Sequence, residues 1–256
     1  MKLALLFFLT LFAQKTFAEW HKKLGISSAH AGFRYSSLLM KKGVIFYRDF
    51  QVDPVITVFF LDDKLEFLGD SVSYRDFIYA DQIRFRTKLS SISDGPLVPA
   101  HKKIKDNDPN RDDTVEWTNT LEFFLPGYGD QYLAEIDLNY SIDLSEHEGQ
   151  SWEVATKVKL FDFKLKNNTL EPNLYVTYGG GDSKHNEFFY GTSNKSGATN
   201  LSAGFWLNLP DKVDRYYPSV QLVYFTALDD FKKGSLSQGR SEGVLFSFIS
   251  ALKLLD

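Results

Sequence analysis

Seven charged residues in the middle of the chain are the strongest candidates for a functional site. Three basic residues alternate along one short segment and four acidic residues lie on the next two segments: Arg84, Arg86, Lys88, Glu116, Glu122, Glu135 and Asp137. A spacing of two residues places side chains on one face of a β-strand. We therefore expect both signs of charge to meet across the interior of whatever these strands enclose.

Two kinds of chemistry are open to such a charge cluster. It could act as a charged eyelet that selects solutes in a wet lumen. It could also form an ion-pair network that fills the interior, because an unpaired buried charge costs several kcal/mol. The network is the preferred interpretation, since a barrel of 10–12 strands is far narrower than open porins of about 16–18 strands.

Motifs for nucleophilic or metal-assisted catalysis are weak. Ser193 follows Gly191-Thr192, but a lipase barrel would carry a histidine two residues before the serine, and His185 lies eight residues away. None of the five histidines is spaced as a metal pair on a strand or a helix: His21, His30, His101, His147 and His185. We expect no enzymatic activity and no metal.

Two loops resemble ligand-binding motifs only in part. Residues 106–113 begin like a calcium loop, but Arg111 occupies the place of the invariant glycine and Trp117 that of the closing glutamate. The run from Gly179 to Lys184 resembles a phosphate loop without its Lys-Ser/Thr ending, and we expect no helix after it. We interpret both as solvated loops and expect no cofactor.

The segments that carry the charge cluster alternate with a period of two, which predicts β-strands. In residues 132–144 one face is apolar except for its tyrosines, and the other carries Glu135, Asp137, Asn139, Ser141 and Asp143. A helix would scatter the apolar residues around its circumference. The chain therefore predicts strands that are apolar on one side and polar on the other.

Counting such runs gives about twelve strands. They lie near residues 26–37, 43–51, 54–61, 64–73, 80–92, 114–125, 131–144, 150–164, 169–179, 199–209, 214–228 and 241–253. Pro54 between the second and third could instead mark an irregular loop, which would leave ten strands. Most of these runs exceed the usual strand length of about 5–6 residues and match tilted membrane-spanning strands.

The connections between these strands are asymmetric. Short turns occur at 126–130, 166–168 and 210–212, and long loops at 93–113, 180–198 and 229–240. Counted back from a periplasmic C-terminus, every long loop falls on the outer side and every short turn on the inner side. This asymmetry is typical of outer-membrane barrels, so we expect an all-β fold with a single antiparallel transmembrane β-barrel.

Composition supports this expectation and removes several alternatives. Aromatic residues make up 16% of a chain whose mean hydropathy is −0.24, the profile of strands that face oil on one side and water on the other. Aromatic residues near strand ends are expected to form interfacial girdles: Tyr74, Phe77, Tyr79, Tyr128, Phe188, Phe189, Tyr190, Tyr216, Tyr217 and Phe231. There is no cysteine, hence no disulfide framework, and a net charge of −4 without a basic stripe indicates no nucleic-acid partner.

Residues 1–18 have the composition of a secretory signal peptide. Lys2 supplies the positive charge, residues 3–13 form an apolar stretch, and Thr16-Phe17-Ala18 form a cleavage site ahead of Glu19. The apolar stretch is shorter than the roughly 20 residues that a membrane-spanning helix needs. We expect export through the Sec pathway and one barrel domain over residues 19–256 in the cell outer membrane, with its lipids as partners.

The order of several segments resembles the MipA/OmpV family of outer-membrane proteins. These segments are Pro54 before the aromatic pair Phe59-Phe60, the strand start from Asp113 to Glu116, the run Asn186-Glu187-Phe188-Phe189-Tyr190-Gly191-Thr192-Ser193, and Tyr224 to Leu228 before a polar loop and the closing strand. The resemblance covers nearly all of residues 19–256. It implies a non-enzymatic scaffold that links a lytic transglycosylase to a murein synthase. A narrow channel with a charged lumen is the alternative, and a barrel lipid hydrolase is the third hypothesis.

Overall fold

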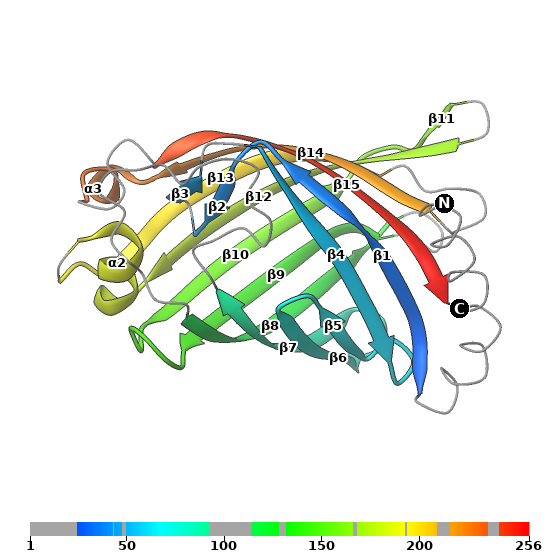
Figure 1. Cartoon of the computed structure of the whole chain (residues 1–256), viewed down its shortest axis with the longest axis horizontal. Helices are drawn as coiled ribbons and strands as arrows, with labels where there is room; N and C mark the ends of the chain where they lie inside the picture. Colours follow the sequence, from blue (N-terminus) through cyan, green and yellow to red (C-terminus); the bar gives the residue numbers. More distant parts are fainter. Residues whose placement is uncertain are drawn as a thin grey trace, which may run out of the picture.

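Twelve antiparallel strands form one closed barrel (Figure 1). The computed structural model describes residues 25–42, 44–47, 50–92, 114–127, 132–165, 168–192, 194–208, 216–234 and 241–255. The barrel strands are β1 (Ile26–Ser36), β4 (Gln51–Phe60), β5 (Leu65–Leu68), β6 (Ser71–Tyr79), β7 (Ile83–Ile92), β8 (Thr114–Pro126), β9 (Tyr132–Asp143), β10 (Gln150–Lys159), β12 (Asn168–Gly181), β13 (Gly197–Asn208), β14 (Tyr216–Ala227) and β15 (Glu242–Leu255). The predicted fold class and the strand number of twelve are confirmed, and the alternative of ten is wrong.

The ring closes because every barrel strand has two neighbours. β1 pairs with both β4 and β15, and β10 pairs with β12 from Ser151↔Gly181 to Lys159↔Asn173. The short strand β11 (Phe163–Leu165) pairs only with β12 and projects from one end of the barrel (Figure 1). A closed ring leaves no free sheet edge around most of its circumference.

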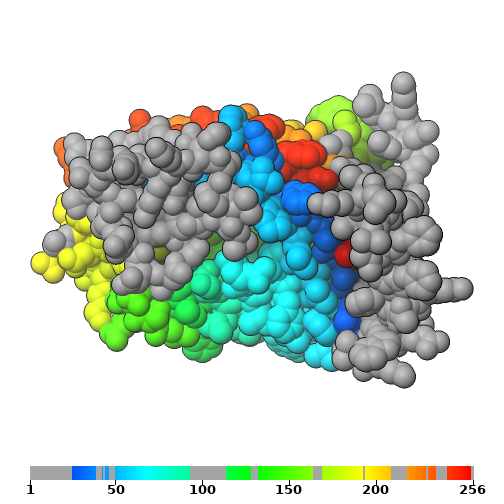
Figure 2. Space-filling model, viewed as in Figure 1, coloured from blue at the N-terminus to red at the C-terminus, as the bar shows by residue number. Residues whose placement is uncertain are grey.

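The two faces of the wall have opposite polarity. Inward positions are polar and buried, such as Thr57, Glu122 and Ser202, and outward positions are apolar and exposed, such as Phe33, Leu138 and Val176. β1, β4 and the strands that follow lie side by side along the face shown in Figure 2. A water-soluble sheet sandwich would bury its apolar face. This barrel exposes its apolar face on the outside, as an outer-membrane barrel does.

The two ends of the barrel differ in their connections. One end, the mouth end, holds residues 37–42 and 44–47, the loop 144–149, and the helices α2 (Ser183–Tyr190) and α3 (Asp229–Lys232) (Figure 1). The other, the turn end, holds the turns 61–64 and 80–82 and the last described residues, since Ala29 pairs with Leu255. The strands that flank all three predicted long loops end at the mouth end, so the predicted asymmetry is confirmed.

Two of the predicted strand runs are not single wall strands in the structure. The predicted run 43–51 is not one wall strand: β3 (Val44–Tyr47) pairs with β2 (Leu39–Lys41) in a separate hairpin that folds into the mouth, and Gln51 begins β4. Residues 64–73 are divided by a turn at Gly69-Asp70 into β5 and the start of β6. Pro54 lies inside β4, beyond the last β5 partner at Thr57, where a missing N–H removes no hydrogen bond from that side.

The helix α2 is another departure from the sequence prediction, which placed no helix after Gly179 to Lys184. The Asp182 carboxylate caps it by accepting the His185 N–H at 2.9 Å, and Gly191 ends it at φ 68° with its N–H on the Glu187 carbonyl. The Asp182 carboxylate already occupies the N-terminus of α2. This is a further reason to reject a phosphate site there. Neither α2 nor α3 is long and apolar enough to cross a bilayer.

Candidate functional site: the charged lumen and the mouth

The predicted charge cluster lies along one wall and does not span the interior. Strand register places Arg84 opposite Glu122, and Glu122 opposite Asp137. Arg84 Nε donates to Glu122, and Arg86 Nη2 lies 3.0 Å from the other oxygen of the same carboxylate. Glu122 is 1% exposed. An ion-pair network is therefore present, and its members come from neighbouring strands, because adjacent inward positions are closer than opposite walls.

Two further acids complete this network. Glu135 pairs with Lys157 Nζ at 3.5 Å, and ligand oxygens of Glu122, Glu135 and Asp137 lie within 4.8 Å of one another. Three carboxylates this close favour a cation among them. Arg84, Arg86 and Lys157 supply this positive charge to Glu122 and Glu135. Asp137 forms no ion pair with a described residue, and its buried Oδ1 has no hydrogen-bond partner among them.

The remaining two residues of the cluster lie nearer the mouth end and apart from the network. Glu116 pairs with Lys42 Nζ at 3.2 Å, a residue of the folded-in hairpin. Lys88 forms no ion pair with any residue in the described part of the chain. Both line a lumen cavity of about 920 Å³.

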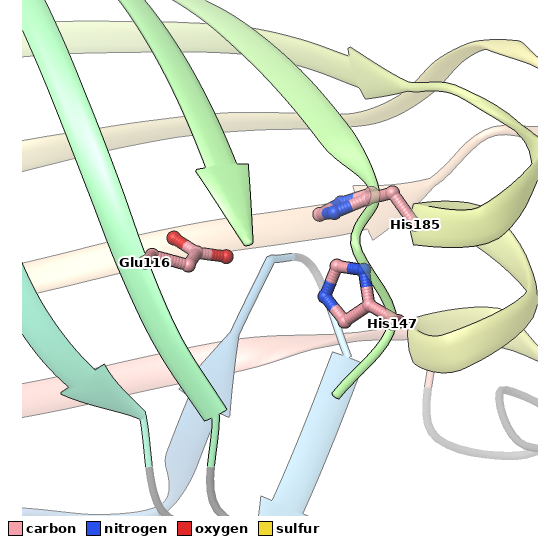
Figure 3. A group of neighbouring side chains, drawn as sticks. All are labelled: Glu116, His147 and His185. Carbon is pink, nitrogen blue, oxygen red and sulfur yellow. The ribbon is translucent and has the colours of Figure 1, made fainter. Parts of the chain in front are cut away.

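Glu116 belongs to a second group that the sequence did not predict (Figure 3). His147 from the loop after β9 and His185 from α2 point toward it, with the two imidazole centroids 5.6 Å apart. The loop reaches α2 because Gly149 has no side chain; a Cβ there would lie 2.5 Å from His185 N. No sequence signal was available, since the histidines are far apart in the chain and meet only through barrel closure.

The loop that carries His147 is fixed by one carboxylate. Asp143 Oδ1 accepts the backbone N–H groups of Ser145, His147 and Glu148 at 3.1–3.2 Å, and its other oxygen accepts from Thr114. Multiple N–H donors on one carboxylate form a rigid turn. His147 is therefore held in place by its backbone.

Two histidines and a carboxylate are a common donor set for zinc or iron, but the geometry of this group does not suit a metal. His147 Nδ1 accepts the Gly149 N–H at 2.9 Å, which leaves the proton of a neutral ring on Nε2 and no lone pair there for a metal. Nε2 itself lies 3.4 Å from an Asp143 oxygen without an aligned hydrogen bond. The Lys42 ammonium also lies beside Glu116. A divalent cation would have to displace that ammonium and reverse the tautomer, so the set does not fit a metal as arranged.

Lys42 instead acts as a latch between the hairpin and the wall. Its ammonium contacts Glu116 on β8 and donates to Ser151 Oγ on β10 at 3.3 Å, while its carbonyl accepts from the Tyr190 hydroxyl of α2. Three elements of the mouth are thus joined at one residue.

Apolar packing closes the mouth around this latch. Val44 packs with Phe189, Tyr190, Ala227 and Phe231, and Ile45 packs with Leu38 and Phe225. The interfacial role predicted for Phe189, Tyr190 and Phe231 is therefore wrong, because they are buried in this cluster at the mouth. Tyr74, Phe77 and Tyr79 are exposed, as a girdle requires; Tyr128 lies outside the described residues.

The two mouth histidines are held in the neutral form. Burial lowers the pKa of His147, with Lys42 acting in the same direction and Asp143, Glu116 and Asp182 opposing. Burial, Lys42 and His147 together hold the pKa of His185 well below 6.5. Unfolded histidine takes up a proton below about pH 6.5 and the folded residues do not, so stability of the mouth falls as pH decreases through that value.

We expect acid to loosen α2. Hydrogen-exchange protection of the α2 amides, corrected for intrinsic rates, should fall by up to about tenfold per pH unit between pH 6.5 and 5. The His185→Gln variant should lose most of this pH dependence. Protection that is equal at pH 7 and pH 5 in the native chain would contradict this reading.

The hydrolase hypothesis gains no support from this geometry. Ser193 lies outside the described residues, and the His185 ring packs against Phe189 at a centroid distance of 4.6 Å. No family model matches the chain, and no curated protein matches it either.

Proposed function

We propose that the protein is an outer-membrane barrel that serves as a non-enzymatic scaffold of the MipA/OmpV type. The observation that carries the proposal is the polarity of the closed wall, which is apolar outside and polar inside. A bilayer is the solvent that favours this arrangement, since every strand satisfies its backbone within the ring. On the same ground we propose that the barrel lies in the outer membrane.

The interior of the barrel supports a static role. The hairpin, α2 and α3 pack together at the mouth, and Arg84, Arg86, Glu122, Glu135 and Lys157 in the lower lumen form ion pairs with one another. A barrel built for rapid conduction keeps a continuous wet path. We propose that this one presents a rigid surface to enzymes of murein synthesis and hydrolysis, a lytic transglycosylase and a murein synthase.

The turn end offers a surface on which such an enzyme could dock. The β11–β12 hairpin projects beyond the barrel (Figure 1) and carries Phe161 and Phe163, which are 66% and 48% exposed with ring centroids 4.4 Å apart. Clustered exposed aromatics are typical of interaction hot spots.

Replacing this aromatic pair is expected to weaken capture of the partner. The double variant Phe161→Ser/Phe163→Ser should retain less than about a tenth of the lytic transglycosylase pulled down from solubilised envelopes, which corresponds to at least about 1.4 kcal/mol. The matched control is Leu144→Ser, an exposed apolar residue at the mouth end. Equal capture by all three proteins would refute the proposed docking surface. No capture by the native chain would refute the scaffold role.

A narrow channel is the second candidate, and the lumen cavity of about 920 Å³ favours it, because its lining includes Lys88, which forms no ion pair with a residue that the structure describes. Planar-bilayer recording of the purified barrel separates the two. A scaffold gives no steady current, whereas a stable ion-selective current would establish the channel. Lys42→Ala, which removes the latch, shows whether the mouth is the barrier.

A further inference from the structure

The β2–β3 hairpin is joined to the wall more loosely than α2 is. Its two strands pair with each other and form a sheet of their own. At its base the Ser37 N–H donates to the Phe246 carbonyl at 2.8 Å, and beyond Ser37 no backbone hydrogen bond joins its described residues to a barrel strand. By contrast, two hydrogen bonds between Asp182 and Gln150 tie the start of α2 to β10. The hairpin can therefore move without breaking the barrel.

Side chains hold the hairpin in the mouth. Val44 and Ile45 supply its apolar contacts. Lys42 supplies the polar ones, to Glu116 on β8 and Ser151 on β10. Lys42, Glu116 and Ser151 all line the lumen cavity of about 920 Å³. Departure of the hairpin would therefore remove part of the cavity lining at the mouth.

Two imidazoles lie beside the ion pair between Lys42 and Glu116. A ring nitrogen of His147, a ring nitrogen of His185 and a carboxylate oxygen of Glu116 all lie within 4.8 Å of one another (Figure 3). The Lys42 ammonium opposes protonation of both rings. While both rings are neutral, this group holds one positive and one negative charge. Protonation of both rings would place three cations around one carboxylate, and Lys42 is the cation on the loosely joined element.

His185 has less compensating negative charge than His147. The carboxylates of Asp143 and Asp182 favour the protonated form of His147. The charges that face His185, apart from the carboxylate of the ion pair, are Lys42 from the hairpin and a protonated His147 from the loop, and both oppose its protonation. Asp182 accepts the backbone N–H of His185. Protonation of His185 is therefore the change that most disfavours the closed mouth.

A buried amide at the base of the hairpin also disfavours the closed mouth. Gln51 begins β4 and is 2% exposed, yet neither its Nε2 nor its Oε1 has a hydrogen-bond partner among the described residues. The hydroxyl of its strand neighbour Ser36 donates to Ser247 instead. A buried polar group without a partner is costly, and movement of the hairpin base would let water bond this amide.

We propose that the β2–β3 hairpin is a gate that leaves the mouth when the imidazoles of His147 and His185 become protonated and the ion pair of Lys42 is lost. The open state connects the lumen cavity to the medium and keeps the wall intact. Because the gate is closed at neutral pH, it is compatible with the static role proposed above. It goes beyond that role and does not depend on the murein partners.

Proton linkage sets the pH range of the gate. In the closed mouth, burial and then Lys42 hold the pKa of His185 well below 6.5, whereas a histidine in water has a pKa of about 6.5. The open state therefore binds more protons than the closed state. As the pH falls below about 6.5, the ratio of open to closed rises by up to about tenfold per pH unit for His185.

Labelling of a single cysteine in the lumen tests the gate. The chain has no cysteine, and Ser141 lines the cavity and is 5% exposed. In the purified Ser141→Cys barrel in detergent micelles, we measure the rate of reaction with a charged thiosulfonate reagent, relative to the same chain unfolded in urea at that pH. This relative rate should rise at least about tenfold from pH 7.5 to pH 5. Far-UV circular dichroism should not change, because the wall persists. Equal relative rates at the two pH values, or loss of the strand signal, would overturn the proposal.

Variants in the Ser141→Cys background assign the effect to the mouth. With His185→Gln the rise should be less than about threefold. The matched control is His30→Gln, a histidine that pairs with Lys253 toward the turn end, and it should keep the rise of the parent. Lys42→Gln should react at least about fivefold faster than the parent at pH 7.5, since the latch is gone. If His185→Gln kept the full rise, or Lys42→Gln reacted at the rate of the parent, the gate would be refuted.

Discussion

Glu122→Gln is expected to lower the free energy of unfolding of the barrel by about 3 kcal/mol. Glu122 is 1% exposed, and its carboxylate forms ion pairs with both Arg84 and Arg86. Without its charge, two guanidinium groups remain side by side in a confined lumen. The loss of a buried partner costs more than the pair contributes, because the remaining charges keep their desolvation penalty.

Urea unfolding in lipid vesicles, followed by tryptophan fluorescence, measures this loss. Glu148→Gln is the matched control, because Glu148 pairs with Lys184 at an exposed site and should change stability by less than about 1 kcal/mol. A second substitution, Arg84→Gln, in the Glu122→Gln background should recover part of the loss. If the Glu122→Gln variant unfolded at the same urea concentration as the native chain, the network would have no structural role. That result would favour the interpretation of these charges as an eyelet that selects solutes.

Leu138→Arg is expected to cost about 2–4 kcal/mol, the penalty for a cation near the middle of a bilayer on the lipid face of a barrel. Leu138 lies outward on β9, and its cross-strand neighbours Leu121 and Val154 are also exposed and apolar. On a protein surface that faces water the same change would cost less than about 0.5 kcal/mol.

The comparison for Leu138→Arg is Leu144→Arg. Leu144 is exposed to a similar degree but lies in the loop at the mouth end, where a charged side chain reaches water. Refolding yield into vesicles and urea midpoint should separate the two variants. Two variants of equal stability would argue that the apolar band of the wall does not contact lipid.

Most of the wall could be predicted from the sequence because its signal is local. Along β9 the inward residues are polar except for Leu133 and the outward residues are apolar or aromatic, and a period of two survives in any environment that has two different faces. The lengths of the connections between strands also distinguish the two ends of the barrel, and these lengths can be read from the sequence alone. The same logic placed Arg84, Glu122 and Asp137 inside, although it did not show that they share one wall.

The mouth could not be predicted, since its pattern is set by tertiary contacts. Residues 43–51 contain an apolar run that is typical of a strand, yet Val44 and Ile45 are buried against α2, α3 and β14 and do not face out from the wall. The shortness of β5 depends on a turn at Gly69-Asp70, which a continuous run of alternating residues conceals. His147 and His185 meet only because β10 pairs with β12.

Tryptophan quenching tests the lipid-facing wall most directly. Trp117 is 43% exposed on the outer face of β8. Trp206 lies inside the lumen, where Lys157 Nζ is 5.2 Å from the centroid of its ring. In vesicles of brominated phosphatidylcholine, a variant that retains only Trp117 should lose most of its fluorescence and resist aqueous iodide, and one that retains only Trp206 should be unaffected by bromine. Iodide quenching of Trp117 at the level of free tryptophan, with no effect of bromine, would contradict a barrel whose apolar face lies against acyl chains.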